Sequence, residues 1–95
     1  MKHKPTHERQ MNGGAQKIYR FANGYGASVV RHEFSYGGSD GLWELAVVKF
    51  HGPDIYQFDL EYNTPITNDV IGRITEDEVE ALLDRIEQLE PSTQE

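Results

Sequence analysis

The sequence of 95 residues contains no cysteine, and this absence excludes disulfides, thiolate metal sites and a thiol nucleophile. It also lacks any apolar run near the roughly 20 residues that a membrane-spanning helix requires. The N-terminal residues show no apolar stretch of the kind found in a secretory signal peptide. We therefore expect a protein that works in the cytoplasm without membrane contact.

Positive charge is scarce, and the formal net charge is −7 at pH 7. Residues 75–95 contain eight acidic residues and one arginine, whereas residues 1–74 contain eight acidic and eight basic residues. Within the first 20 residues, five lysines and arginines accompany only one acid, Glu8. The net acidity argues against direct nucleic-acid binding, because such binding needs cations that displace the counterions of the phosphates.

Three regions differ in composition. Residues 1–16 are polar, include one proline and two glycines, and show no apolar periodicity, so we predict a disordered basic head. Residues 17–90 hold the apolar patterns and are predicted to form a single domain, followed by a short disordered tail at 91–95. A domain of this size has a modest core, which disfavours a deep enclosed active site.

All ten aromatic residues lie between Tyr19 and Tyr62, interleaved with valine and leucine and separated by glycine-containing turns. This pattern predicts four strands, at about 17–22, 27–35, 42–51 and 55–62. Short links join antiparallel neighbours, so the predicted sheet is a meander. Pro65 restricts the segment 63–73 to a loop or, at most, an edge strand.

The stretch "FANGYGASVV" (21–30) resembles a phosphate-binding glycine loop only superficially. Such a loop normally opens a helix whose first amides hold the anion, but here a strand pattern follows the glycines. Asn23-Gly24 between apolar strands is typical of a hairpin turn, because both residues tolerate positive φ. We interpret the segment as a turn.

Residues 75–90 carry the pattern of an amphipathic helix. Thr75 and Glu78 form a capping box, and Ile74 and Val79 are placed for a hydrophobic staple. One apolar stripe runs along the helix, formed by Val79, Leu82, Leu83, Ile86 and Leu89. The predicted fold class is therefore α+β: a four-stranded antiparallel meander sheet with one C-terminal helix packed on one face.

A tight hairpin at Gly52-Pro53 predicts the register of the last two strands. It pairs Val47 with Phe58, Leu45 with Leu60 and Trp43 with Tyr62, all facing the helix. In the first hairpin, the predicted inward set is Tyr19, Phe21, Val30 and Phe34, and the predicted outward set is Arg20, Arg31 and Glu33.

The same register gathers Glu44, Asp59 and Glu61 on the outer face of the sheet. Clustered carboxylates suit a divalent cation or an acid pair, but Arg20 and Arg31 on that face favour a solvated ionic ladder. His3 has a spacing from the N-terminus that can chelate copper or nickel, which we interpret as accidental. We predict no metal, no cofactor and no catalytic residue.

Two regions are candidates for contact with a partner. The glycine-rich loop 36–41 carries Tyr36 and Asp40, and such loops often bind partners, although a plain hairpin connection is an equal interpretation. The outer face of the predicted helix carries five acids that suit a basic partner surface or imitate DNA phosphates: Glu76, Asp77, Glu80, Asp84 and Glu87. A merely solvated face is the simpler interpretation of this charge.

The phrases "KIYRFANGYGASVV", "YGGSDGLWELAVV" and "NTPITNDVIGRITEDEVEALLDRI" occur in this order over about residues 17–90. In this respect the chain resembles a group of small uncharacterised proteins encoded by tailed bacteriophages, chiefly those of actinobacteria. The resemblance rests on the order of the phrases and supplies no catalytic motif or functional residue. It implies a small accessory protein that acts in the cytoplasm of an infected host cell.

Three functions follow from these features. The first is a noncatalytic protein-binding module, a phage-encoded modulator of a host enzyme or defence system, whose partner is a host or phage protein. The second is an acidic DNA mimic that inhibits a nucleic-acid-binding protein. The third is a small metal-dependent hydrolase that uses the outer carboxylates. We expect the first, because no acid, base and nucleophile stand out together in the sequence.

Overall fold

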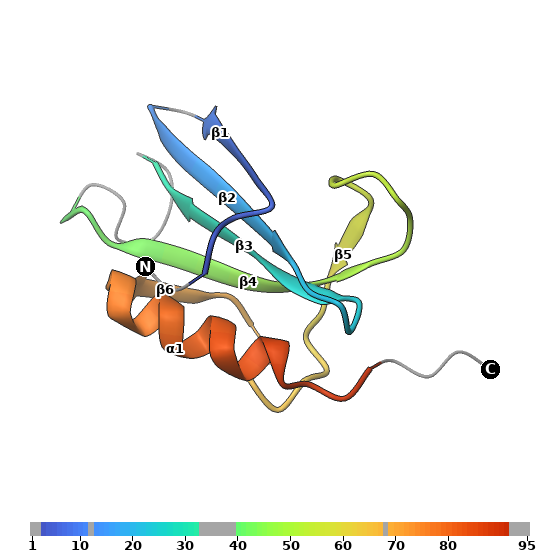
Figure 1. Cartoon of the computed structure of the whole chain (residues 1–95). Coiled ribbons are helices and arrows are strands. Elements are labelled where there is room, and N and C mark those ends of the chain that lie inside the picture. The colour runs from blue at the N-terminus through green and yellow to red at the C-terminus, as the bar shows by residue number, and fades with distance from the viewer. Residues whose placement is uncertain (1–2, 12, 33–39, 68, 92–95) are drawn as a thin grey trace.

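The computed structural model describes residues 3–11, 13–32, 40–67 and 69–91. These residues form one antiparallel sheet and a C-terminal helix (Figure 1). In chain order the elements are β1 (His7–Met11), β2 (Gly14–Arg20), β3 (Tyr25–Arg31), β4 (Trp43–Phe50), β5 (Phe58–Leu60), β6 (Ile71–Ile74) and α1 (Glu76–Glu87). No helix in this part of the chain has the length and apolar character needed to cross a bilayer.

The α+β class and the C-terminal helix are confirmed, but over the described residues the sheet has six strands, not the predicted four. Five strands follow one another in the order β1-β2-β3-β4-β5, and β6 also pairs with β4. β5 pairs with the end of β4, at Val48–Phe50, whereas β6 pairs with its start, at Trp43 and Leu45. β6 is the edge strand that the sequence allowed after Pro65, and β4 therefore pairs with three strands: β3, β5 and β6.

The first additional strand lies in the segment that was predicted to be disordered. Residues 7–11 form β1 and pair with β2 from His7↔Ile18 to Met11↔Gly14. β2 itself begins at Gly14, so the prediction of a disordered head at 1–16 is wrong for these residues. The prediction relied on the polar composition of these residues, but a charged edge strand needs little apolar surface and is held by backbone hydrogen bonds. In the predicted tail, residues 92–95 lie outside the described residues.

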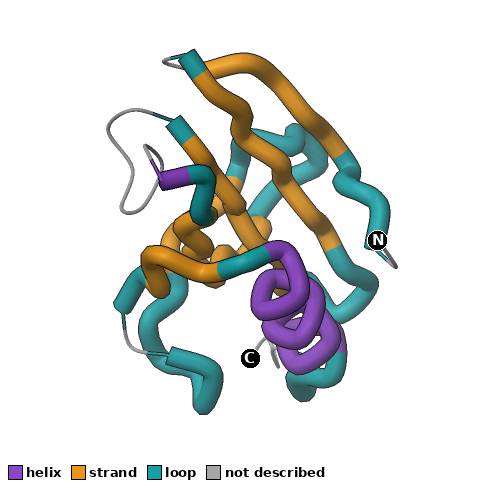
Figure 2. Tube along the Cα trace, turned by 90° about the vertical axis from the view of Figure 1, so that its left-hand side faces the viewer, coloured by secondary structure: helices purple, strands orange, loops and turns teal. Residues whose placement is uncertain are grey.

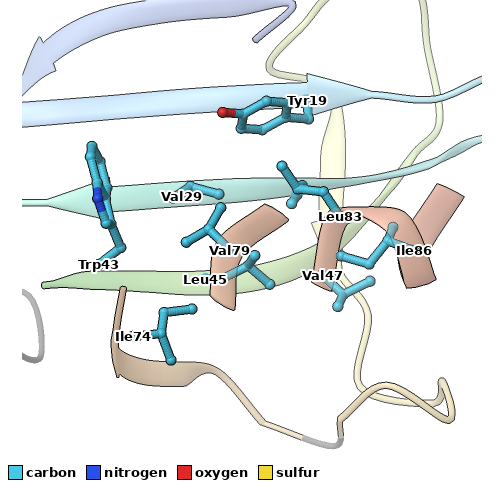
Figure 3. Packing of buried hydrophobic residues seen from close by; sticks show 10 residues of the cluster. Tyr19, Val29, Trp43, Leu45, Val47, Ile74, Val79, Leu83 and Ile86 are labelled. Atoms are coloured by element: carbon cyan, nitrogen blue, oxygen red, sulfur yellow. The ribbon is translucent and has the colours of Figure 1, made fainter. Parts of the chain in front are cut away.

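The main core lies between α1 and one face of the sheet (Figures 2 and 3). Its buried residues are Tyr19, Ala27, Val29, Trp43, Leu45, Val47, Ile74, Val79, Leu83 and Ile86. The predicted capping box is confirmed, since Glu78 N donates to the Thr75 hydroxyl and Thr75 N donates to the Glu78 carboxylate. The helix thus begins at the predicted place. Of the predicted stripe, Val79, Leu83 and Ile86 are buried, and Leu82 and Leu89 are partly buried against the core.

The predicted register of the last hairpin is wrong. The structure pairs Phe50 with Phe58 and Val48 with Leu60, a shift of three residues from the predicted pairing. The cause is the connection: residues 51–57 form a wider loop, closed by His51 N–Gln57 O and Gln57 N–Asp54 O hydrogen bonds. An odd shift moves each side chain to the other face. Phe58 therefore packs with Ile18, Val48 and Phe50 on the face away from α1, and Leu60 and Tyr62 are exposed.

The inward set of the first hairpin is corrected at one position. Val29, not Val30, joins the buried cluster, because Lys17 pairs with Val29 and Gln16 with Val30. Tyr19 is buried as predicted, and Phe21 packs against the same cluster. Phe34 and Glu33 lie outside the described residues.

The segment 21–25 is a turn, as predicted, and has a second role. Gly24 has a φ of 89°, and Gly24 N donates to Phe21 O. The Asn23 side-chain amide donates to the carbonyls of Ile86 and Leu89, each at 3.0 Å. Ile86 lies in the last turn of α1, where its carbonyl also accepts from Leu89 N, and Leu89 lies just beyond the helix, so the hairpin side chain caps the C-terminal end of α1.

Candidate cation site on the acidic face of the helix

Three carboxylates form a row along α1. Glu80, Asp84 and Glu87 are separated by four and three residues, and side chains with this spacing are neighbours on a helix surface. Like charges at this spacing repel each other, so the row favours a positive group placed against it. The sequence pattern predicted this row but no occupant for it.

The N-terminal segment supplies the positive group. The chain before β1 leads towards α1 (Figure 1), and His3 lies against the carboxylate row. Its Nδ1 is 2.8 Å from Glu80 Oε1, and its Nε2 is 3.0 Å from Glu87 Oε1 and 3.7 Å from Asp84 Oδ1. The backbone N–H of His3 also donates to Glu80 Oε1 at 3.1 Å.

The residues before β1 are held by the sheet as well as by the helix. Thr6 N donates to Ile18 O at 2.8 Å, and the Thr6 hydroxyl accepts from Arg20 N at 2.9 Å. The His3 ring lies edge-on to Phe21, with 5.7 Å between ring centroids. This packing leaves the His3 side chain 9% exposed, so the imidazole is fixed by contacts on several sides.

The three carboxylates differ in how far their side chains are buried. The Glu80 side chain is 16% exposed, whereas those of Asp84 and Glu87 are 44% and 48% exposed. Burial of the His3 ring opposes its protonation, but the hydrogen bonds and charges of Glu80 and Glu87 outweigh this effect. The pKa of His3 is therefore raised above its ordinary value of 6.5.

Two buried oxygens near this row lack a partner. Among the described residues, neither the Tyr19 hydroxyl nor Glu80 Oε2 has a hydrogen-bond partner, although both atoms are buried. Burial raises the pKa of Tyr19 to about 12, and Glu80 is the carboxylate that adds most to this effect. The inner side of the cluster therefore has unused hydrogen-bonding capacity, which is uncommon for buried polar groups.

The structure brings together three of the seven residues predicted to contact a partner. Glu76 and Asp77 are exposed in the first turn of α1, outside the contacts of His3. Asp40 Oδ2 accepts from Arg73 Nη2 at 2.9 Å. Tyr36 lies outside the described residues.

The predicted grouping of Glu44, Asp59 and Glu61 is wrong. Glu44 pairs with Val30, while Asp59 pairs with Lys49, and strand alternation puts these two pairs on opposite faces of the sheet. The predicted ionic ladder between these acids and the two arginines is therefore wrong as well. Arg20 lies over Phe50, with its Cζ 4.6 Å from the ring centroid, and Arg31 lies over Trp43 on the other face, at 4.4 Å.

A second group of polar residues borders an open hollow beside β5. Its volume is about 570 Å³, and it is lined by Lys49, Phe50, His51, Asp59 and Glu61. His51 Nε2 is 3.8 Å from Asp59 Oδ2, and both side chains are more than half exposed. Because they face solvent, this pair is less constrained than the His3 cluster.

Comparison with protein-family models, curated proteins and solved structures found no match to this chain. The functional interpretation therefore rests on the geometry of the site. Sequence reasoning missed the role of His3, although the opposite charges of the two ends of the chain were a signal that they attract each other.

Proposed function

We propose that this chain is a noncatalytic protein-binding module whose contact surface is the acidic face of α1. We define this face by Glu76, Asp77, Glu80, Asp84 and Glu87. One observation supports the proposal: a segment of the same chain already lies against this face and places His3 among three of its carboxylates. A partner segment that presents a basic side chain can make the same contacts.

The charge of the face indicates the class of partner. Asp84 and Glu87 are close to half exposed, and Glu76 and Asp77 are exposed, so the face remains accessible around His3. Charged groups of this kind steer a partner of opposite charge and favour fast association that weakens with salt. The proposed partner is therefore a protein with an extended basic segment. In a phage setting, which the sequence resemblance suggests, it is a host or phage protein.

The experiment is affinity capture from a lysate of the proposed host, with quantitative mass spectrometry. The informative variant is Asp84→Asn/Glu87→Gln, which removes two charges and keeps the side-chain shapes. The matched control is Glu8→Gln/Asp59→Asn, which removes the same charge from exposed strand positions. We expect a specific partner to be lost only from the first variant, and its capture to fall as salt rises.

Three outcomes separate this proposal from its alternatives. If both variants lose the partner equally, net charge alone explains the capture and the proposed surface is wrong. If the partner is a nucleic-acid-binding protein that duplex DNA displaces, the acidic DNA mimic is the better description. If no captured protein depends on either pair, while the purified chain turns over a substrate, the noncatalytic proposal fails.

A further inference from the structure

We propose that His3, Asp84 and Glu87 bind a divalent transition-metal ion of the zinc class, with Glu80 holding the histidine ring in place. This inference goes beyond the proposed function and does not rest on it, because an ion can bind the isolated chain. It concerns a mixed set of nitrogen and oxygen donors that come from two segments far apart in the sequence.

The positions of the three donor atoms fit one small cation. His3 Nε2, Asp84 Oδ1 and Glu87 Oε1 all lie within 4.8 Å of one another. Nε2 is 3.0 Å from the Glu87 oxygen and 3.7 Å from the Asp84 oxygen. Two ligands at about 2.1 Å from a tetrahedral zinc ion are about 3.4 Å apart, which lies between these distances.

Glu80 holds the His3 ring in the orientation that metal binding requires. Its Oε1 is 2.8 Å from His3 Nδ1, so an Nδ1–H donates to it, and a metal ion that displaces the Nε2 proton would meet the Nε2 lone pair on the side of Asp84 and Glu87. Histidines that bind metals almost always donate their other ring N–H to a carboxylate or carbonyl, which fixes the ring. Glu80 is also the most buried of the three carboxylates, as expected for a residue that orients a ligand.

A separate observation comes from the buried side of the cluster. The Tyr19 residue is 1% exposed, yet its hydroxyl has no hydrogen-bond partner among the described residues, and the same holds for Glu80 Oε2. Of the charged groups that act on this hydroxyl, Glu80 has the largest effect. The Tyr19 hydroxyl and Glu80 Oε2 can therefore accept or donate further hydrogen bonds to water that accompanies an ion.

Charge also favours an ion over a proton. A divalent ion on the neutral ring brings two positive charges to the side of the ring where Asp84 and Glu87 lie, whereas protonation of the ring brings one. Imidazole and carboxylate together suit zinc, cobalt or nickel, while calcium and magnesium prefer oxygen ligands alone. Asp84 and Glu87 are almost half exposed, so the ion has a path from solvent and water can complete its coordination.

The test uses the full chain with the metal alone. Zn²⁺ is titrated by calorimetry, and Co²⁺ is titrated in parallel because its visible absorption reports the coordination geometry. We expect one ion per chain. Glu80→Gln should weaken binding by about 10–100-fold, as loss of an orienting carboxylate does elsewhere. His3→Ala and Asp84→Asn/Glu87→Gln should each weaken it at least as much.

The controls separate this site from two alternatives. Glu8→Gln/Asp59→Asn should keep the wild-type affinity, and an equal loss there would assign the binding to diffuse charge. If only His3→Ala abolishes binding, the ion is chelated by the N-terminal residues and the proposed site is wrong. No heat and no spectral change at millimolar metal would also overturn it. Because no partner is present, none of these results depends on the proposed protein-binding function.

Discussion

Leu83 provides the sharpest test of how α1 is held to the sheet. Its side chain is fully buried, and its neighbours in the core include Val79, Ile86 and Val47. Leu83→Ala removes three carbons, which costs about 2.4 kcal/mol at about 0.8 kcal/mol for each buried CH₂. The cavity left against a rigid sheet adds to this, so we expect a total loss of about 3–5 kcal/mol.

A loss of this size is a large part of the stability of a domain of about 95 residues, roughly 5–14 kcal/mol. Urea titration with circular dichroism measures it. The control is Leu82→Ala, which removes the same atoms from the next residue, where the side chain is only partly buried. Alanine is the stronger helix former, so neither variant weakens the helix itself. A loss below about 1 kcal/mol for Leu83→Ala, or equal losses for both variants, would refute the packing described above.

Three further predictions test the N-terminal strand, the helix cap and the buried tyrosine. Deletion of residues 1–11 removes β1 and the contacts of His3, so the thermal midpoint should fall clearly; an unchanged midpoint would show that β1 adds no stability. Asn23→Ala removes the amide that donates to the carbonyls of Ile86 and Leu89 and should cost about 1–2 kcal/mol in urea titration, whereas a variant as stable as the wild type would contradict the cap. The folded pKa of Tyr19 is raised to about 12 from the ordinary 10.0, so the unfolded chain loses this proton first and stability should fall as pH rises from 10.0 to about 12. Tyr19→Phe should remove that dependence and leave stability at neutral pH nearly unchanged, because the hydroxyl has no hydrogen-bond partner among the described residues; an unchanged pH profile would contradict this.

Sequence pattern was sufficient where a local signal and burial agree. The helix is the clearest case: Thr75 and Glu78 mark its start, and the stripe that contains Leu83 marks its buried face. The Asn23-Gly24 turn was equally readable, because positive φ limits the residues that fit there. Each of these features depends on neighbours within a few residues along the chain.

The register of β4 and β5 shows where a local signal was insufficient. Gly52 and Pro53 suggested a tight turn, but the structure uses a seven-residue loop whose shape depends on the side chains of Asp54 and Gln57. Asp54 Oδ1 accepts from Tyr56 N at 2.8 Å, and Gln57 Oε1 accepts from Asp54 N at 2.8 Å. Such loop hydrogen bonds have no periodic pattern. Because the predicted turn was too short, the prediction placed Phe58 and Leu60 on the wrong face of the sheet.

The candidate site depends on a pairing that carries almost no sequence signature. β1 is held to β2 by backbone groups, which every residue has, and its side chains are largely exposed, so its polar sequence looks like that of a disordered segment. That pairing nevertheless determines where the residues before β1 lie. Because β1 runs antiparallel beside β2, the residues before it return to the helix, and His3 reaches Glu80, Asp84 and Glu87. Without β1 these carboxylates form a solvated acidic row, as the sequence predicted. With β1 in place, the His3 ring is buried against Glu80, and one ring nitrogen faces the carboxylate oxygens of Asp84 and Glu87, which is the arrangement on which the proposed cation site rests.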